Sequence, residues 1–170
     1  MRAKNLVLGI GSPVVCDDAI AFHVIEKLRS LGLPDTDMEE ASTSGLDLIE
    51  MMLDYEVAVI VDAIITGAVP PGTVMVLAEE SFSTSVHGVN PHEANIASSI
   101  QLGHTLMPDR MPKCIYFVVV EVNDVWTVTD KMTLEVQEAV EPATNTVLGL
   151  LEGKEYPIHI INLQKPEDEG

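Results

Sequence analysis

The chain has 170 residues, of which 46% are hydrophobic, so it can bury the core of one domain without disulfides or a structural metal. Acidic residues outnumber basic residues by 27 to 9, and the formal net charge is -18. That charge repels phosphate backbones and anionic membrane surfaces. The composition therefore predicts a single compact domain that does not bind nucleic acid.

Cysteine use and the N-terminal segment bear on location. Cys16 and Cys114 belong to no CxxC pair or Cys-His cluster, so we expect reduced thiols rather than a disulfide or a zinc motif. The apolar run at residues 6–10 is too short for a signal-peptide core or a membrane span. We therefore expect a cytoplasmic protein with no membrane span.

The first half of the chain alternates between strand and helix patterns. Residues 5–10 are a short apolar run that ends at Gly11, which predicts a strand buried on both faces. Apolar residues then recur at helical spacing from Asp18 until Gly32 ends the pattern. The next expected elements are a weaker strand at 37–41, a short helix at 46–53 and the strongest strand at 55–63.

The second half continues the alternation. The expected elements, in order, are a strand at 73–77, a Ser-rich loop that holds His87, a helix at 91–102, a strand at 113–122 and a helix at 133–151. Pro142 should bend or divide the last helix, because proline removes a helical hydrogen bond. Strands that alternate with helices predict an α/β fold, a three-layer α/β/α sandwich with a mostly parallel central sheet.

The chain shows no internal repeat and no linker. Residues 1–153 are expected to form one domain, and residues 154–170 an acidic C-terminal tail that ends in KPEDEG. We expect this tail to be partly disordered, since terminal segments fray unless they are anchored.

Polar side chains follow three of the expected strands. Asp17 and Asp18 come after the first strand, Asp62 closes the third, and His87 lies in the loop after the fourth. In an open α/β sheet, the loops at the carboxyl edge converge on a crevice. We therefore expect carboxylates from two strands and an imidazole to meet at this edge.

Each of these residues also has an alternative role. Asp17 and Asp18 are neighbours in the sequence, so only one of them can face a shared site. Asp17 is well placed to cap the following helix, which would leave Asp18 to face the site. Alternatively, both residues only cap the helix. Asp62 follows a run of apolar residues, where a carboxylate must be hydrogen-bonded, paired or bound to a cation, or must cap a neighbouring loop. His92 is a rival of His87 for the imidazole.

Two carboxylates and one imidazole on separate loops would form a mixed oxygen and nitrogen site suited to nickel or zinc. Three protein ligands leave positions open for water or for a group on a partner, which suits a catalyst or a sensor. Other chemistries lack their motifs. Val14 replaces the third glycine of a dinucleotide fingerprint, and the chain has no Walker loop, GxSxG elbow, HExxH or paired Asp-Thr-Gly motif.

Longer segments resemble the nickel-iron hydrogenase maturation endopeptidases. GIGSPVVCDDAIAFHVIEKL resembles the opening strand, loop and helix of that family, and EASTSGLDLIEMMLDYEVAVIVDAIITGAVPPGTV resembles its second block. SVHGVNPHEANIASSIQLG, KCIYFVVVEV and TLEVQEAV resemble the remainder, so the likeness covers about residues 4–152. The ordered combination of GxG, DD, VDA, PPGTV and a later His is more specific than any one piece.

The resemblance implies an α/β/α fold and an endopeptidase that removes a C-terminal extension from a hydrogenase large-subunit precursor after nickel insertion. It places the catalytic and metal-engaging roles on Asp18, Asp62 and His87. The nickel is then carried by the precursor, which is the protein's partner, and serves as the recognition element. Other divalent metals are expected to occupy the site in vitro.

This chain departs from the family pattern at several positions. Ser12 replaces the usual Asn, Ala19 and Ala21 stand where glycine is common, and residues 40–45 replace a DGGTxG-like turn. Lost glycines remove access to positive φ, so the turn and the cleavage specificity are expected to differ. Two alternatives follow: a non-proteolytic module that binds nickel or the precursor, and another metal-dependent hydrolase on the same fold.

Overall fold

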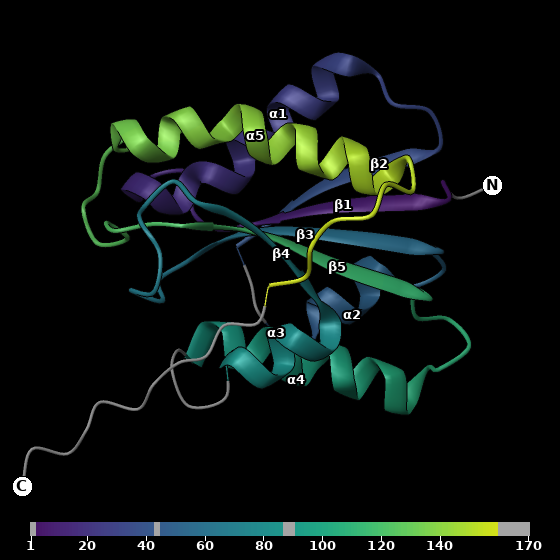
Figure 1. Cartoon of the computed structure of the whole chain (residues 1–170). Coiled ribbons are helices and arrows are strands. Elements are labelled where there is room, and N and C mark those ends of the chain that lie inside the picture. The colour runs from purple at the N-terminus through teal and green to yellow at the C-terminus, as the bar shows by residue number, and fades with distance from the viewer. Residues whose placement is uncertain (1–2, 43–44, 87–90, 160–170) are drawn as a thin grey trace, which may run out of the picture.

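The computed structural model describes residues 3–42, 45–86 and 91–159, and its strands form a sheet between two layers of helices (Figure 1). The strands are β1 (Asn5–Ile10), β2 (Thr36–Ala41), β3 (Val57–Ile64), β4 (Val74–Ala78) and β5 (Cys114–Glu121). The helices are the short 3-10 helix η1 (Cys16–Ala19), α1 (Ile20–Leu31), α2 (Asp47–Met52), α3 (Glu79–Val86), α4 (Pro91–Leu106) and α5 (Leu134–Leu151). The predicted three-layer α/β/α fold is confirmed.

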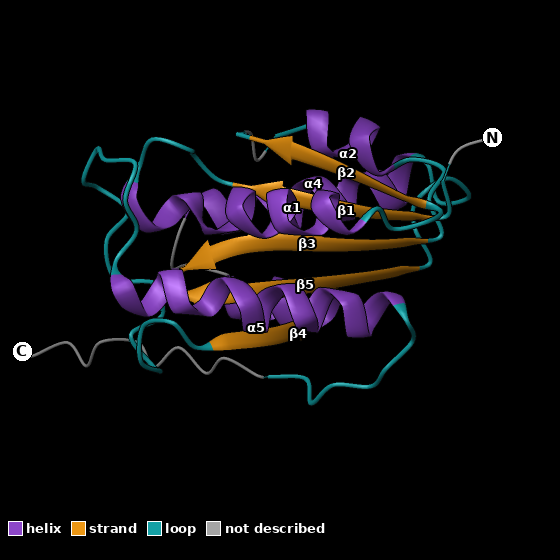
Figure 2. Cartoon of the chain, turned by 90° about the horizontal axis from the view of Figure 1, so that it is seen from above, coloured by secondary structure: helices purple, strands orange, loops and turns teal. Residues whose placement is uncertain are grey.

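Within the described residues the sheet has the strand order β2-β1-β3-β5-β4. Neighbouring strands pair in parallel, except that β4 runs antiparallel to β5 at one edge. The prediction of a mostly parallel sheet is therefore confirmed. Helices α1 and α5 lie over one face of the sheet, and α2, α3 and α4 cover the other (Figures 1 and 2).

The apolar strands β1 and β3 contribute to both cores because successive side chains of a strand point to opposite faces. Val7 and Val59 pack into the core under α1 and α5. Leu8 and Ile60 pack into the core under α2, α3 and α4. A strand that is buried on both faces has no polar side, which is why these two segments appear in the sequence as unbroken apolar runs.

The carboxyl ends of β1 and β3 lie side by side in the middle of the sheet. From β1 the chain passes to β2 on one side, and it later returns to place β3 on the other side. Open α/β sheets bind ligands where the strand order reverses in this way. The fold therefore places the ends of β1 and β3 at the position best suited to a functional site.

One expectation about local structure is wrong, and another is narrowed. The Ser-rich segment is not a loop up to His87, because residues 79–86 form α3. Phe82 on this helix is buried and stacks on Phe117 of β5, with ring centroids 3.8 Å apart, so packing outweighs the weak helix propensity of serine and threonine. Of the two effects expected of Pro142, division of the last helix does not occur, since α5 runs through this residue and keeps Ala143 and Val147 in the core.

The described part of the C-terminal tail lies alongside β4. Ile158 forms a parallel bridge with Val76, and the backbone N–H of His159 donates to the Val76 carbonyl at 2.9 Å. Residues 160–170, which include most of the predicted acidic tail, lie outside the described residues. No helix in the described ranges is both long enough and apolar enough to cross a membrane.

Candidate functional site

Asp18 reaches the central crevice because the chain turns sharply after β1. At Gly11 the φ angle is 158°, and a Cβ atom there would collide with the backbone oxygen of Asp18. A glycine is therefore required for η1 to fold back against the end of β1. The Asp18 carboxylate, which is half-buried, is hydrogen-bonded by the backbone of Ser12.

Asp62 lies near the end of β3, and only 1% of it is exposed. Its Oδ1 atom accepts a hydrogen bond from the backbone N–H of Ala63 at 2.8 Å. Its Oδ2 atom is buried and has no well-formed hydrogen-bond partner. A buried carboxylate oxygen without a partner is costly, so it marks a position where a ligand would be favourable.

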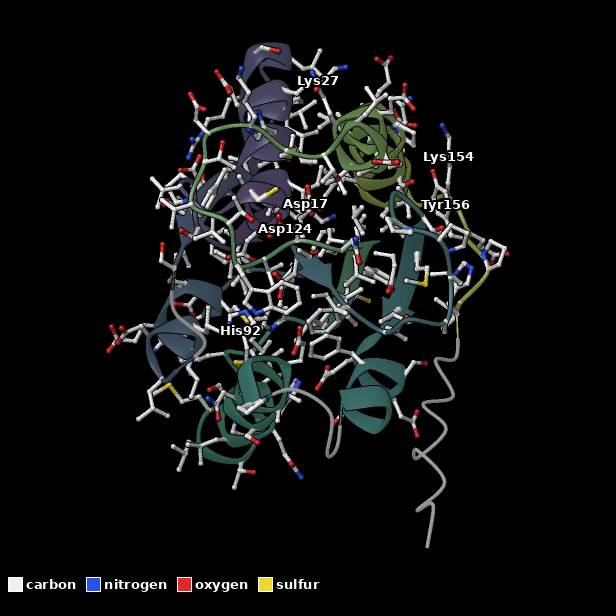
Figure 3. All side chains as sticks on the ribbon, turned by 90° about the vertical axis from the view of Figure 1, so that its left-hand side faces the viewer. Asp17, Lys27, His92, Asp124, Lys154 and Tyr156 are labelled. Carbon is white, nitrogen blue, oxygen red and sulfur yellow. The ribbon has the colours of Figure 1, made fainter. Side chains whose placement is uncertain are left out.

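The imidazole next to Asp62 belongs to His92, in the first turn of α4. The His92 Nε2 atom lies 3.5 Å from Asp62 Oδ2, which is the outer limit of a hydrogen bond. Figure 3 looks onto this edge of the molecule and shows His92 below Asp17 and Asp124. The predicted histidine, His87, lies outside the described residues.

The route by which a histidine reaches this crevice differs from the prediction. We expected the loop after the fourth strand to lie at the same edge as Asp62. Because β4 is antiparallel, its last residue, Ala78, lies beside Tyr116 near the start of β5, away from that edge. Helix α4 instead begins at the crevice and brings His92 to Asp62.

Glu93 is a fourth ionisable side chain at the crevice, and the sequence analysis missed it. Only 3% of Glu93 is exposed, and its Oε2 atom has no hydrogen-bond partner. The one signal in the sequence was its position directly after His92. A helix start does not reveal which of two neighbouring residues faces inward, so the packing of α4 was needed to find it.

Three of these side chains line a small hollow of about 190 Å³, whose lining residues are Asp18, Ala63, Ile65, His92, Glu93 and Val125. Asp62 lies behind this lining, in contact with His92. Among the described residues, no three His, Cys, Asp or Glu side chains already form a set that could hold a metal ion. The site is therefore an open acidic crevice in which one imidazole lies 3.5 Å from Asp62 Oδ2, and in which Asp62 Oδ2 and Glu93 Oε2 lack a well-formed hydrogen bond. Such a site can accept a cation that another molecule helps to ligate.

Burial raises the pKa of all three carboxyl groups at the crevice. It raises the pKa of Asp62 to about 6 and that of Glu93 to about 7, and it also raises the pKa of Asp18. The nearby imidazole of His92 opposes these shifts. The Asp62 carboxylate in turn raises the pKa of His92, so protons and cations are both attracted to this crevice.

Asp17 has a different role from the one predicted, because it does not cap the helix that follows it. The buried Asp17 carboxylate accepts hydrogen bonds from the backbone N–H and the hydroxyl of Thr133, at 2.8 and 2.9 Å to Oδ1. Its Oδ2 atom accepts a further bond from the backbone N–H of Asp124 at 3.2 Å. Asp17 therefore holds the loop between β5 and α5 against η1.

Glu121 at the end of β5 is a second buried carboxylate with complete partners. Only 2% of it is exposed. Its Oε1 atom accepts hydrogen bonds from the backbone N–H groups of Thr66 and Gly67, both at 2.8 Å, and Oε2 accepts from the Thr66 hydroxyl at 2.7 Å. Glu121 thereby fixes the loop that follows β3.

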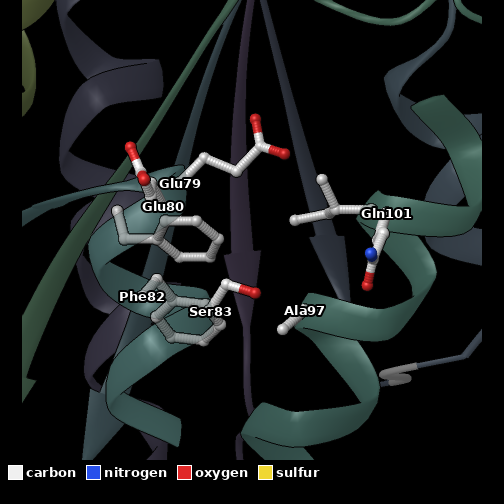
Figure 4. Close-up of a pocket in the computed structure, with 8 residues that line it drawn as sticks. Glu79, Glu80, Phe82, Ser83, Ala97 and Gln101 are labelled. Atoms are coloured by element: carbon white, nitrogen blue, oxygen red, sulfur yellow. The ribbon is translucent and has the colours of Figure 1, made fainter.

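A larger pocket of about 380 Å³ lies between α3 and α4 (Figure 4). It is lined by Glu79, Glu80, Phe82, Ser83, Ala97, Ile100, Gln101 and Phe117. Its carboxylate Glu79 is paired with His104, at 3.0 Å between Oε1 and Nε2. This pocket lacks an unpaired buried polar atom, so its chemistry points less clearly to a ligand than that of the acidic crevice.

Comparisons with known proteins agree with this fold. The hydrogenase 2 maturation protease of Escherichia coli K12 is 29% identical over 151 residues, which are 87% of this chain and 90% of that protein. The solved structure of the E. coli hydrogenase maturating endopeptidase HybD has a TM-score of 0.77 at 29% identity and covers 90% of this chain and 93% of its own. The HybD protease of Thermococcus kodakarensis has the same fold, with a TM-score of 0.72 at 21% identity, covering 88% of this chain and 99% of its own.

A model of the hydrogenase maturation protease family matches residues 22–150. This match spans the helix after η1, the strand that carries Asp62, and α4 with His92 and Glu93. The chain belongs to the hydrogenase maturation protease family and is a peptidase.

Proposed function

We propose that this protein removes a C-terminal extension from a nickel-loaded hydrogenase large-subunit precursor, and that it recognises the precursor through the bound metal. The observation that carries the proposal is the Asp62 Oδ2 atom, which is buried, lacks a well-formed hydrogen bond and faces an imidazole at the end of β3. A divalent cation would compensate the cost of burying this oxygen.

The donor set supports a borderline metal such as nickel. Asp18 and Asp62 offer carboxylate oxygens, and His92 offers a ring nitrogen. The side chains do not form a closed metal centre on their own, which fits a metal that arrives with ligands of the precursor. Docking of that metal would hold the nearby scissile bond in a fixed position, and positioning of this kind can supply much of a rate enhancement.

The surface around the crevice supports a protein substrate. Val125 lines the crevice, and Trp126 and Val128 on the same loop are 74% and 78% exposed. This loop pairs with the segment before η1, where Val14 is 58% exposed. Large exposed apolar side chains beside a functional site are typical of surfaces that bind another protein.

We propose His92 as the imidazole of the site, on the strength of its contact with Asp62. The resemblance of the sequence favoured His87, and its place lies outside the described residues. A pair of variants separates the two histidines. His92→Ala should abolish cleavage and His87→Ala should leave it near the wild-type rate; the reverse result would return the role to His87.

The test of the function is incubation of the purified chain with the nickel-loaded precursor, followed by mass measurement of the precursor. Loss of a C-terminal peptide is expected, and the metal-free precursor should remain intact. Stable binding of the loaded precursor without a change in mass would favour a non-proteolytic binding module. Hydrolysis of small substrates with no effect on the precursor would favour a different metal-dependent hydrolase.

A further inference from the structure

Glu93 is a buried acidic side chain at the crevice that the proposed three-residue site does not use. Resting on the proposed function, we infer that Glu93 is an additional ligand for the cation, so that the pocket offers three carboxylates and one imidazole rather than two carboxylates and one imidazole.

The first argument is the position of the side chain. Glu93 lines the same hollow as Asp18 and His92, in the first turn of α4. It is close enough to Asp62 for their charges to interact. A cation in this hollow would therefore have the Glu93 carboxylate within its immediate surroundings.

The second argument is the unpaired Oε2 atom. With 3% of the residue exposed, water cannot solvate the carboxylate as it does on a surface, and no protein group donates to this oxygen. Asp62 Oδ2 is the other buried side-chain atom in the described ranges without a well-formed hydrogen bond, although His92 Nε2 lies 3.5 Å from it. Two buried carboxylate oxygens at one crevice, on separate elements and both without a well-formed hydrogen bond, indicate a shared positively charged ligand.

Glu121 shows that this chain can satisfy a buried glutamate when the role is structural. It is as buried as Glu93, at 2% against 3% exposed, yet Thr66 and Gly67 donate to both of its oxygens. Burial alone therefore does not explain the unpaired oxygen of Glu93. The difference lies in what each carboxylate faces, which is a backbone loop for Glu121 and the hollow for Glu93.

The chemistry of a third carboxylate differs from that of a neutral side chain of the same shape. An ionised Glu93 adds one negative charge and one hard oxygen donor, and both favour a divalent cation. Rotation about the torsions of the glutamate side chain is needed to close the set, because the side chains do not stand as finished ligands. Glutamine would keep the shape and lose the charge.

The test is the response of the isolated protein to nickel ions alone. Thermal melting is followed with increasing nickel chloride up to millimolar concentration, because stabilisation by a ligand reports its dissociation constant even when binding is weak. The wild type, Glu93→Gln, Asp62→Asn and the matched control Glu121→Gln are compared. The precursor cleavage assay is run on the same four proteins.

Glu93→Gln should raise the nickel dissociation constant about 10-fold and should melt at or above the temperature of the wild type without nickel. Glu121→Gln should melt at a lower temperature and keep the wild-type dissociation constant. Asp62→Asn should lose the nickel response, which confirms that the ion binds at the crevice.

An unchanged dissociation constant in Glu93→Gln, with the response lost in Asp62→Asn, overturns the role of Glu93 and leaves the proposed function standing. A response that survives in Asp62→Asn means that nickel binds elsewhere, and this overturns the role of Glu93. No response in the wild type also overturns it. The cleavage assay decides the proposed function separately in each case.

Discussion

Two groups of buried carboxylates lie near the carboxyl edge of the sheet, and they differ in how they are compensated. Asp17 and Glu121 accept hydrogen bonds from backbone and hydroxyl groups on both of their oxygens. Asp62 and Glu93 are buried to a similar degree, yet each keeps one oxygen without a well-formed hydrogen bond, and the Asp62 oxygen has only the 3.5 Å contact with His92. Sequence position and burial do not distinguish the two groups. The hydrogen bonds that their carboxylate oxygens accept do distinguish them.

The difference indicates which carboxylates serve the fold and which serve a ligand. A carboxylate that accepts several hydrogen bonds stabilises the segments that donate to it. A buried carboxylate with an unpaired oxygen destabilises the free protein and stabilises a complex with a cation. Substitutions in the first group should therefore affect stability, and substitutions in the second group should affect activity.

The largest expected effect is on catalysis and comes from Asp62→Asn. Changes in the partners of metal ligands cost about 10- to 100-fold, so loss of a ligand charge should lower kcat/KM for the loaded precursor by at least about 100-fold. The melting temperature should not fall, because asparagine removes a poorly compensated buried charge. Cleavage at the wild-type rate would place the site elsewhere, and unfolding of the variant would move Asp62 into the structural group.

Asp17→Ala should give the largest loss of stability. It leaves the backbone N–H groups of Thr133 and Asp124 without their carboxylate, which we expect to cost about 2–4 kcal/mol in the free energy of unfolding. Urea unfolding measures this loss. The neighbouring Asp18→Asn is the control and should stay within about 0.5 kcal/mol of the wild type. Equal stability of the Asp17 variant and the wild type would remove the distinction between the two groups.

Trp126→Ala tests whether the loop held by Asp17 binds the substrate. The side chain is 74% exposed, so its removal should leave the melting temperature unchanged. Loss of a large aromatic contact with a protein partner should raise KM for the precursor about 10-fold with little change in kcat. Steady-state kinetics on the loaded precursor provides the measurement, with Leu106→Ala on the far end of α4 as an exposed apolar control. Equal KM values for the wild type and the Trp126 variant would mean that the precursor does not bind this loop.

The smallest effect is on the pH dependence of stability. Burial raises the pKa of Glu93 from 4.5 to about 7 and that of Asp62 from 3.8 to about 6, so the folded protein binds more protons than the unfolded chain over this range. Stability should therefore fall as the pH rises from about 4 to 7, and the raised pKa of His92 acts in the same direction. Asp18, whose pKa is also raised, faces the same hollow and adds to the trend.

The free energy of unfolding should decline less with rising pH in Glu93→Gln than in the wild type, by about 1–2 kcal/mol, since each pKa unit corresponds to about 1.4 kcal/mol. Urea unfolding at several pH values measures the slope, and Glu121→Gln serves as the control that keeps it. A wild-type slope in the Glu93 variant would show that this carboxylate is not a source of the pH dependence.

Parts of the fold that depend on local pattern were predicted well. The unbroken apolar runs gave β1, β3 and β5, and the helical spacing of apolar residues gave α1 and α5. Helix α4 begins at the expected residue, Pro91. These signals are strong because burial on both faces, or along one stripe, constrains every residue of the segment. The positions of Asp18 in the segment after β1 and of Asp62 near the end of β3 followed from the same pattern.

Features that depend on partners distant in sequence were not predicted. Helix α3 exists because Phe82 stacks on Phe117, and Asp17 is an anchor because Thr133 lies beside it, 116 residues further along the chain. Because β4 is antiparallel to β5, it ends at the opposite edge of the sheet from the one that was expected for the loop after it. None of these contacts leaves a trace in the spacing of nearby residues.

The sequence by itself therefore determined the α/β class, the central strands, and the places of Asp18 after β1 and Asp62 near the end of β3, because hydrophobic periodicity and strand ends are local properties. Tertiary structure decided that His92 is the imidazole in contact with Asp62, that Glu93 faces the hollow, and that Asp17 does not. The physical reason is that the fate of a buried charge depends on which donors the fold brings to it, and those donors come from distant segments.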